Sequence, residues 1–222
     1  MTRTFIQQIF TPLVAAVALA ACSRANEVAV RTSPEPANAA VKDQVRADSL
    51  RHPYTQADVD FMSHMIGHHA QALVMSSWAP THGASPSVRT LAERIINAQQ
   101  DEIASMQRWL RQRGKTVPEA SPTGMMMHGG HHEMLMPGML TEAEMKQLDQ
   151  AREPDFDRLF LTFMIQHHKG AVSMVKDLFG TNGAARDETV FKFANDVSVD
   201  QSTEVARMER MLTALPAGEP AR

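Results

Sequence analysis

The stretch FMSHMIGHHAQALVM, residues 61–75, decides the fold because the chain contains it twice. A second copy, FLTFMIQHHKGAVSM, occupies residues 160–174, so the paired histidines recur after 167 − 68 = 99 residues. The segments that follow each copy also match, since QDEIASMQRWL at 100–110 resembles STEVARMERML at 202–212. The chain is therefore an internal duplication.

Capping signals predict that the first half is a pair of helices. A capping box at residues 55–58 begins a helix that Pro80 stops. Ser85 and Pro86 begin a second helix, which ends at Gly114 after a basic last turn. The short loop between the two helices predicts an antiparallel hairpin.

The second half has the same organisation after a short additional helix. A capping box at residues 141–144 begins that additional helix, and Pro154 interrupts it. A long helix is expected over about 155–179, and the last helix ends near Leu215. No segment alternates like a strand, so we expect an all-α protein in which two hairpins bury similar faces against each other as a four-helix bundle.

The N-terminus has the pattern of an export signal. A short positive start precedes an apolar run too short to span a bilayer, and the ending Leu19-Ala20-Ala21-Cys22 resembles a bacterial lipobox. We expect Cys22 to be lipidated, which would tether the protein to the membrane and place it in the periplasm. The outer membrane is favoured if the host is Gram-negative. The predicted divisions are a signal peptide at 1–21, a flexible tether at 22–53 and a bundle at 54–215, the bundle comprising hairpins at 54–114 and 141–215 joined by a linker at 115–140.

The composition is biased towards metal-binding side chains. The chain has 16 methionines and 10 histidines but 1 cysteine. A net charge of −3, without a cluster of basic residues, argues against a nucleic-acid partner. Methionine often fills gaps in a core, but this supply exceeds that need.

The paired histidines lie on the helix face that should be buried. At 100° per residue, Phe61, Met65, His68, His69 and Ala72 share one face. A buried imidazole must find a hydrogen-bond partner, so four of them in one core need a reason. The matching residues of the second copy, which share the same face, are Phe160, Met164, His167, His168 and Ala171.

Two explanations of the buried histidines stay open. The first is a polar network with Gln99, Glu102, Gln201 and Glu204 of the partner helices. The second is metal ligation, because Met65 and His69 are four residues apart and could share one ion. Methionine and histidine together favour Cu(I), with Ag(I) as its soft mimic. The predicted ligands are Met65, His68, His69, Met75, Met164, His167, His168 and Met174, with Met106, Met208 and His64 in support.

The sequence supports some of these residues as ligands less strongly than others. His64 has no counterpart, because Phe163 occupies the matching position, and Met62 is peripheral. The linker adds the same residue types without an expected scaffold, either as an accessory metal loop or as a plain connector. Its candidate ligands are Met125, Met126, Met127, His128, His131, His132, Met134, Met136 and Met139.

The two copies of F-x-x-x-M-I-x-H-H-x-x-A-x-x-M resemble the family catalogued as domain of unknown function 305. The resemblance covers about 54–215 and implies a ferritin-like four-helix fold. Some members are periplasmic copper-binding proteins of the CopM type, which implies copper or silver binding through histidine and methionine and a role in metal tolerance. Nothing in the resemblance extends to the linker.

Three functions follow as hypotheses. The leading one is an envelope lipoprotein that is not an enzyme and that sequesters copper or relays it to a copper-handling partner protein. The second is a copper-dependent oxidase; a di-iron oxidase is disfavoured because the sequence has no Glu-x-x-His spacing. The third is a helical interaction module with a polar histidine core and no metal. The oligomeric state is left open.

Overall fold

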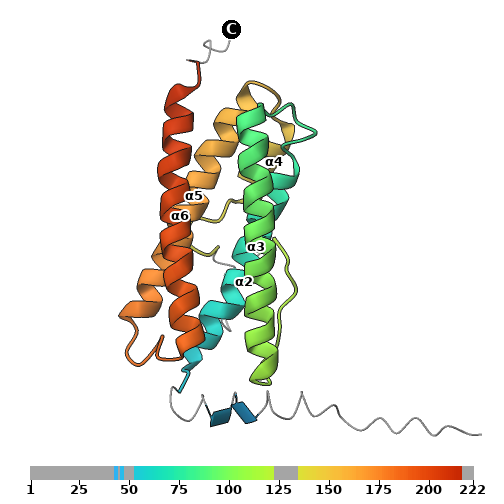
Figure 1. The fold of residues 1–222 in the computed structure, drawn as a ribbon. Helices are drawn as coiled ribbons and strands as arrows, with labels where there is room; N and C mark the ends of the chain where they lie inside the picture. Colours follow the sequence, from blue (N-terminus) through green and yellow to red (C-terminus); the bar gives the residue numbers. More distant parts are fainter. Residues whose placement is uncertain (1–42, 45, 48–52, 123–134, 217–222) are drawn as a thin grey trace, which may run out of the picture. The chain divides into compact units, whose positions relative to one another are not determined.

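The computed structural model describes residues 43–44, 46–47, 53–122 and 135–216. This part of the chain contains five named helices and no β-strand, which confirms the predicted all-α class (Figure 1). The predicted signal peptide, Cys22 and the linker positions 125–134 lie outside the described residues. The helices are α2 (Gln56–Ser77), α3 (Pro86–Gln112), α4 (Glu142–Gln150), α5 (Asp155–Gly180) and α6 (Glu188–Ala214).

The helices begin where the capping signals predict. Thr55 and Asp58 form a complete capping box at the start of α2, and Thr141 and Glu144 form another at the start of α4. Each box satisfies two backbone N–H groups that the first helical turn leaves without partners. Gly114 follows α3 with a φ of +63°, a left-handed conformation that favours glycine.

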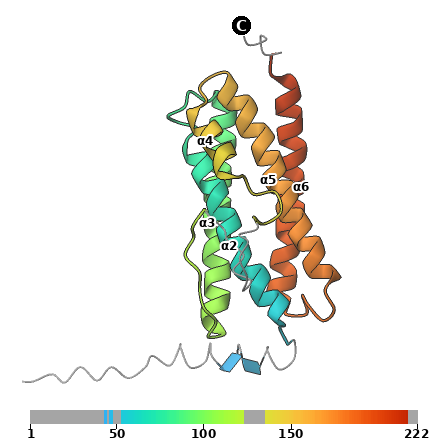
Figure 2. The same cartoon turned by 180° about the vertical axis from the view of Figure 1, so that it is seen from behind.

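The four long helices form two antiparallel hairpins (Figures 1 and 2). Helix α2 packs along α3 and α5 packs along α6, while α2 also contacts α5 and so joins the two halves. The short helix α4 contacts both α2 and α5 at one end of the bundle (Figure 2). The predicted four-helix bundle of two hairpins is confirmed. No helix in the described part of the chain is long and apolar enough to cross a bilayer.

The apolar core is divided into two clusters, which we name by one methionine each. Both the Met65 cluster and the Met164 cluster contain residues from all four long helices, so each cluster is built from both hairpins. The Met65 cluster includes Phe61, Met65, Met106, Trp109, Met174 and Val197, and the Met164 cluster includes Met75, Ile95, Phe160, Phe163, Met164 and Met208.

A short segment at residues 135–140, here called the strap, packs onto the bundle before α4. Gly138 adopts a φ of +76°, and a Cβ on Gly170 of α5 would lie 1.9 Å from the carbonyl oxygen of Pro137. Gln71 of α2 fixes the end of the strap, since its amide donates to the Leu140 carbonyl oxygen and accepts from the Leu140 N–H. Backbone contact of this kind requires glycine on the helix.

The strap corrects one expectation about the linker. The linker was expected to run to residue 140 without a scaffold, but Met136 and Met139 are buried in the Met65 cluster. These two methionines are therefore core residues of the bundle. Their apolar side chains bury against it because the glycine contact brings the strap close.

A buried ion pair lies at the end of the bundle where α3 ends and α6 begins. Asp187 caps α6, accepting from the backbone N–H groups of Thr189 and Val190, and also accepts a hydrogen bond from the Trp109 indole. Arg113, whose side chain is 5% exposed, pairs with the same carboxylate and lies over the Trp109 ring. One carboxylate thus joins the end of α3 to the start of α6, with each charge compensated.

Gly170→Ala should destabilise the protein by about 1–3 kcal/mol, because the new methyl group would collide with backbone atoms of the strap. The matched control is Gly180→Ala at the end of α5, where a Cβ would have no neighbour within 4 Å. Urea unfolding measures both variants. Equal free energies of unfolding for the two would contradict the close contact.

Candidate metal centre

The two histidine pairs occupy the middle of the bundle. His68 and His69 lie on α2 and His167 and His168 on α5, and all four are fully buried. The rings of His68 and His167 have their centroids 3.9 Å apart, across the contact between the two hairpins. The prediction that both pairs face a shared core is therefore confirmed, and we call these four residues the histidine layer.

The outer histidine of each pair is held by a carboxylate on the second helix of its own hairpin. The Nε2 atom of His69 lies 2.7 Å from Oε2 of Glu102 on α3. His168 repeats this contact at 2.8 Å with Glu204 on α6. Both glutamates are partly exposed, with side-chain exposures of 20% and 21%, so the contacts lie at the boundary between the core and solvent.

The inner histidines are held by backbone carbonyl groups. The Nε2 atom of His68 lies 3.0 Å from the carbonyl oxygen of Pro137 in the strap. The Nε2 atom of His167 lies 3.0 Å from the carbonyl oxygen of His68 itself. A carbonyl oxygen only accepts hydrogen bonds, so in both rings Nε2 carries the hydrogen.

Every Nδ1 atom of the layer is left without a hydrogen-bond partner among the described residues. A neutral imidazole that donates from Nε2 has a lone pair on Nδ1. Four buried Nδ1 atoms without a partner among the described residues are costly in a folded core. On a neutral ring this nitrogen carries the lone pair with which histidine binds a metal ion.

Burial keeps the inner histidines neutral. Desolvation by burial lowers the pKa of His68 to about 3, and the repulsion of a charge on the nearby His69 adds to this effect. The same two causes, burial first and then the charges of the neighbouring histidines, hold the pKa of His167 well below its ordinary value. Both rings are therefore uncharged and able to act as ligands at neutral pH.

The predicted polar network is present in part. Glu102 and Glu204 pair with histidines as expected, but the buried amides of Gln99 and Gln201 have no hydrogen-bond partner among the described residues. A network that leaves both amides and all four Nδ1 atoms unsatisfied does not by itself explain the buried polar groups.

The methionines predicted as ligands on the four long helices form two groups. Met65, Met106 and Met174 belong to the Met65 cluster, and their repeat-related partners Met164, Met208 and Met75 belong to the Met164 cluster. Because α2 and α5 are antiparallel within the pseudo-twofold arrangement, Met75 lies in the cluster of Met164. Each cluster thus combines methionines from both halves.

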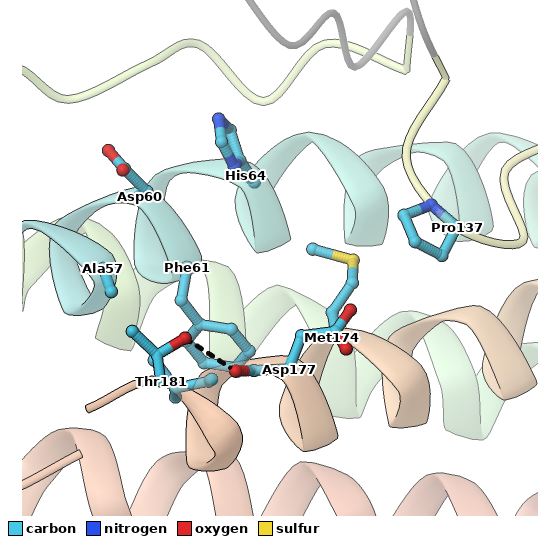
Figure 3. Close-up of a pocket in the computed structure, with 9 residues that line it drawn as sticks. Ala57, Asp60, Phe61, His64, Pro137, Met174, Asp177 and Thr181 are labelled. Carbon is cyan, nitrogen blue, oxygen red and sulfur yellow. Dashed lines mark hydrogen bonds between the residues drawn. The ribbon is translucent and has the colours of Figure 1, made fainter. Parts of the chain in front are cut away.

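The donor chemistry limits which metal these residues suit. In the described part of the chain no three His, Cys, Asp or Glu side chains are placed to hold one ion. A site built here would draw on thioether sulfur together with imidazole nitrogen, which favours Cu(I) over zinc. His64, the unrepeated candidate, is half-buried and lines an open pocket with Met174 (Figure 3).

Several residues that shape the site were not predicted from sequence. Pro137 supplies the acceptor for His68, and Gly138, Gly170 and Gln71 hold the strap that carries it. The sequence contains one clue to the strap, because the two copies of the repeat differ where Gln71 aligns with Gly170. Both members of this unmatched pair contact the strap.

The metal-free protein should lose stability as the pH falls from 7 to 5. The unfolded chain binds protons on His68 and His167 below a pKa of about 6.5, whereas the folded chain does so only at much lower pH. Each group then removes about 2 kcal/mol in total over this range, because the slope reaches about 1.4 kcal/mol per pH unit only well below pH 6.5.

Urea unfolding of the metal-free protein at several pH values measures this loss, with a His68→Gln, His167→Gln variant as control. Glutamine keeps an N–H donor but does not titrate, so the variant should lose the part of the pH dependence that comes from these histidines. A wild-type pH dependence equal to that of the variant would contradict the assignment.

Comparison with known proteins places this site in a family. The family model described as domain of unknown function (DUF305) matches residues 58–212. A DUF305 fragment from Deinococcus radiodurans is 31% identical with a TM-score of 0.61, over 73% of this chain and 99% of that one. A DUF305 protein from Streptomyces coelicolor, named as a secreted protein, is 29% identical with a TM-score of 0.59, over 71% and 91%.

The copper-binding protein CopM is also similar. Its Cu(II)-bound form is 31% identical with a TM-score of 0.55, over 70% of this chain and 95% of CopM. The Cu(I)-bound and Ag-bound forms match at 28% and 27% identity.

One curated relative matches over a shorter region. It is an uncharacterized protein of Acanthamoeba polyphaga mimivirus, L153, which is 39% identical over 62 residues. The chain spans 41% of the length of this relative, and the match covers 27% of the chain. The family model, in contrast, covers most of the bundle, including both histidine pairs. The chain belongs to the DUF305 family.

Proposed function

We propose that this protein binds Cu(I), with Ag(I) as a mimic, and holds or relays it in the cell envelope. The observation that carries the proposal is the histidine layer, in which the four buried Nδ1 atoms have no hydrogen-bond partner among the described residues while every Nε2 is anchored. An ion that accepts the lone pairs of these atoms would compensate their burial.

The contacts around the layer have the form of an outer coordination shell. Histidines that bind metals commonly donate their second ring N–H to a carboxylate or a backbone carbonyl, which orients the ring and raises its basicity. Glu102 and Glu204 supply the carboxylates, and the Pro137 and His68 carbonyl groups supply the others. The arrangement recurs in both halves, which supports ligation more than chance burial.

The methionine clusters supply soft donors on both sides of the layer. Met65 lies four residues before His69 and Met164 four residues before His168, so each pair shares a helix face. All four side chains are fully buried. We assign one half-site to Met65 and His69, with Met106 and Met174, and the other to Met164 and His168, with Met208 and Met75.

The comparisons support a metal-binding role outside the cytoplasm. CopM has been solved with copper and with silver, and a similar DUF305 protein is named as secreted. The predicted export signal agrees with such a location, and lipid on Cys22 would anchor the protein, at the outer membrane of a Gram-negative host. The duplicated ligands favour buffering or relay, because catalysis needs a single fixed site that substrate can reach.

Replacing Met65 and Met164 together by leucine should weaken Cu(I) binding, because leucine keeps the volume but removes the sulfur donor. The measurement is an anaerobic titration against a chromophoric Cu(I) chelator. Met62→Leu is the matched control, since Met62 is fully buried in the same core but peripheral to the predicted ligand face. Equal affinities of wild type and the double variant would exclude these sulfurs as ligands.

The four-histidine variant, with His68, His69, His167 and His168 changed to alanine, tests the layer in the same titration. It should lose high-affinity Cu(I) binding, and Cu(I) should raise the melting temperature of the wild type by mass action. A wild type that neither competes for Cu(I) nor gains thermal stability would instead indicate the polar module without metal.

Glu102→Gln with Glu204→Gln should lower Cu(I) affinity by about 10- to 100-fold, because the amide still accepts the hydrogen bond but no longer raises the basicity of the imidazole. Glu209→Gln is the control, since Glu209 is half exposed and pairs with the exposed Lys169 instead of a histidine. The same chelator competition measures both. An unchanged affinity would mean that the glutamates do not serve the metal.

A further inference from the structure

The two ends of the duplicated bundle differ in their access to solvent. At one end an open pocket of about 260 Å³ lies between α2 and α5 (Figure 3). The thioether of Met174 extends from α5 towards α2 in this pocket, between His64 and Pro137 (Figure 3). The other polar lining residues are Asp60, Asp177 and Thr181.

The repeat shows what occupies the related place at the other end. The repeat relates residues that are 99 positions apart. At the other end, the residue related to His64 is Phe163. The residues related to Asp177 and Asp60 are Trp78 and Leu159. Thr181 becomes His82, whose ring packs against Trp78 and Phe156. Helix α4 adds Leu148 to the same cluster. Large apolar and aromatic side chains therefore fill this end.

The exposure of the two related methionines follows this difference. Met174 is 9% exposed, whereas Met75 is 0% exposed. The pocket also reaches towards the histidine layer, because Pro137 lines it and the carbonyl group of Pro137 holds His68. A cation in the pocket would meet the thioether of Met174, and His64, Asp60 and Asp177 are among the residues that line the pocket.

These donors suit the cation of the proposed function. Carboxylates attract a positive ion through the surrounding field, and the thioether selects a soft one. The ion would pass from the rim of the pocket to Met174, a member of the Met65 cluster.

Resting on the proposed function, we infer that this pocket is the entrance for a soft monovalent cation and that the two half-sites load unequally. The half-site with Met174 exchanges ions directly with solvent. The half-site with Met75 is covered by aromatic side chains and exchanges more slowly. The duplication thus provides one accessible and one enclosed site.

The two tryptophans allow each half-site to be observed separately. Trp109 belongs to the Met65 cluster, and Trp78 packs against the Met164 cluster. Stopped-flow mixing of the full-length protein with Ag(I) would follow quenching by the heavy ion. The Trp78→Phe variant reports through Trp109 and the Trp109→Phe variant through Trp78. We expect the Trp109 signal to fall at least about tenfold faster, a difference of about 1.4 kcal/mol in barrier.

Closing the pocket tests the route itself. His64→Phe, added to the Trp78→Phe variant, places the side chain of the enclosed end in the pocket and should slow the Trp109 phase by about tenfold. Phe163→Leu in the same background is the control at the repeat-related position and should leave this phase unaltered. The comparison needs only the Trp78→Phe background, so it stands even if Trp109→Phe fails to fold.

The outcomes separate the two proposals. If Ag(I) binds at equilibrium but the Trp109 phase keeps its rate in the His64→Phe variant, the pocket is not the entrance, although the binding function stands. Equal rates at the two tryptophans would also overturn unequal loading. If neither tryptophan responds and equilibrium competition detects no bound ion, the proposed function fails as well.

Discussion

The burial of four imidazoles in the centre of the bundle is the constraint on which the rest of the structure depends. A polar ring removed from water must keep its hydrogen bonds, so each Nε2 needs an acceptor at a fixed position. Glu102 and Glu204 meet this need from α3 and α6, which ties each of these helices to the histidine of its own hairpin. The contact between His167 and the His68 carbonyl group in turn joins the two hairpins.

The strap meets the same need for His68, and it shows how a duplicated fold departs from its symmetry. The two copies of the repeat differ at Gln71 and Gly170, and both positions hold the strap, one through paired hydrogen bonds and the other through the absence of a side chain. The second copy uses no strap for His167, which bonds to a carbonyl group of α2 instead. The histidines are therefore symmetric in position, but His68 and His167 have different hydrogen-bond acceptors.

This inequality gives a physical basis for function in a duplicated protein. Two half-sites of the same donors would bind alike, but their access to solvent differs because an open pocket is present beside His64, whereas Phe163 belongs to a filled core. Neutral inner histidines keep the layer ready for a cation at neutral pH, since protonation would be opposed by burial. An accessible and an enclosed site together could hold metal firmly and still exchange it.

The sequence by itself determined the helices, their ends and the burial of the histidines, because capping residues and the 3.6-residue period act locally. The repeat also identified Met65, His68 and His69 and their partners as one duplicated face. Only the tertiary structure decided that Met75 joins the cluster of Met164, that the Gln99 and Gln201 amides find no partner in the described part of the chain, and that Pro137 anchors His68. These contacts join residues far apart in the chain, so they depend on how antiparallel helices and the strap pack, which no local pattern records.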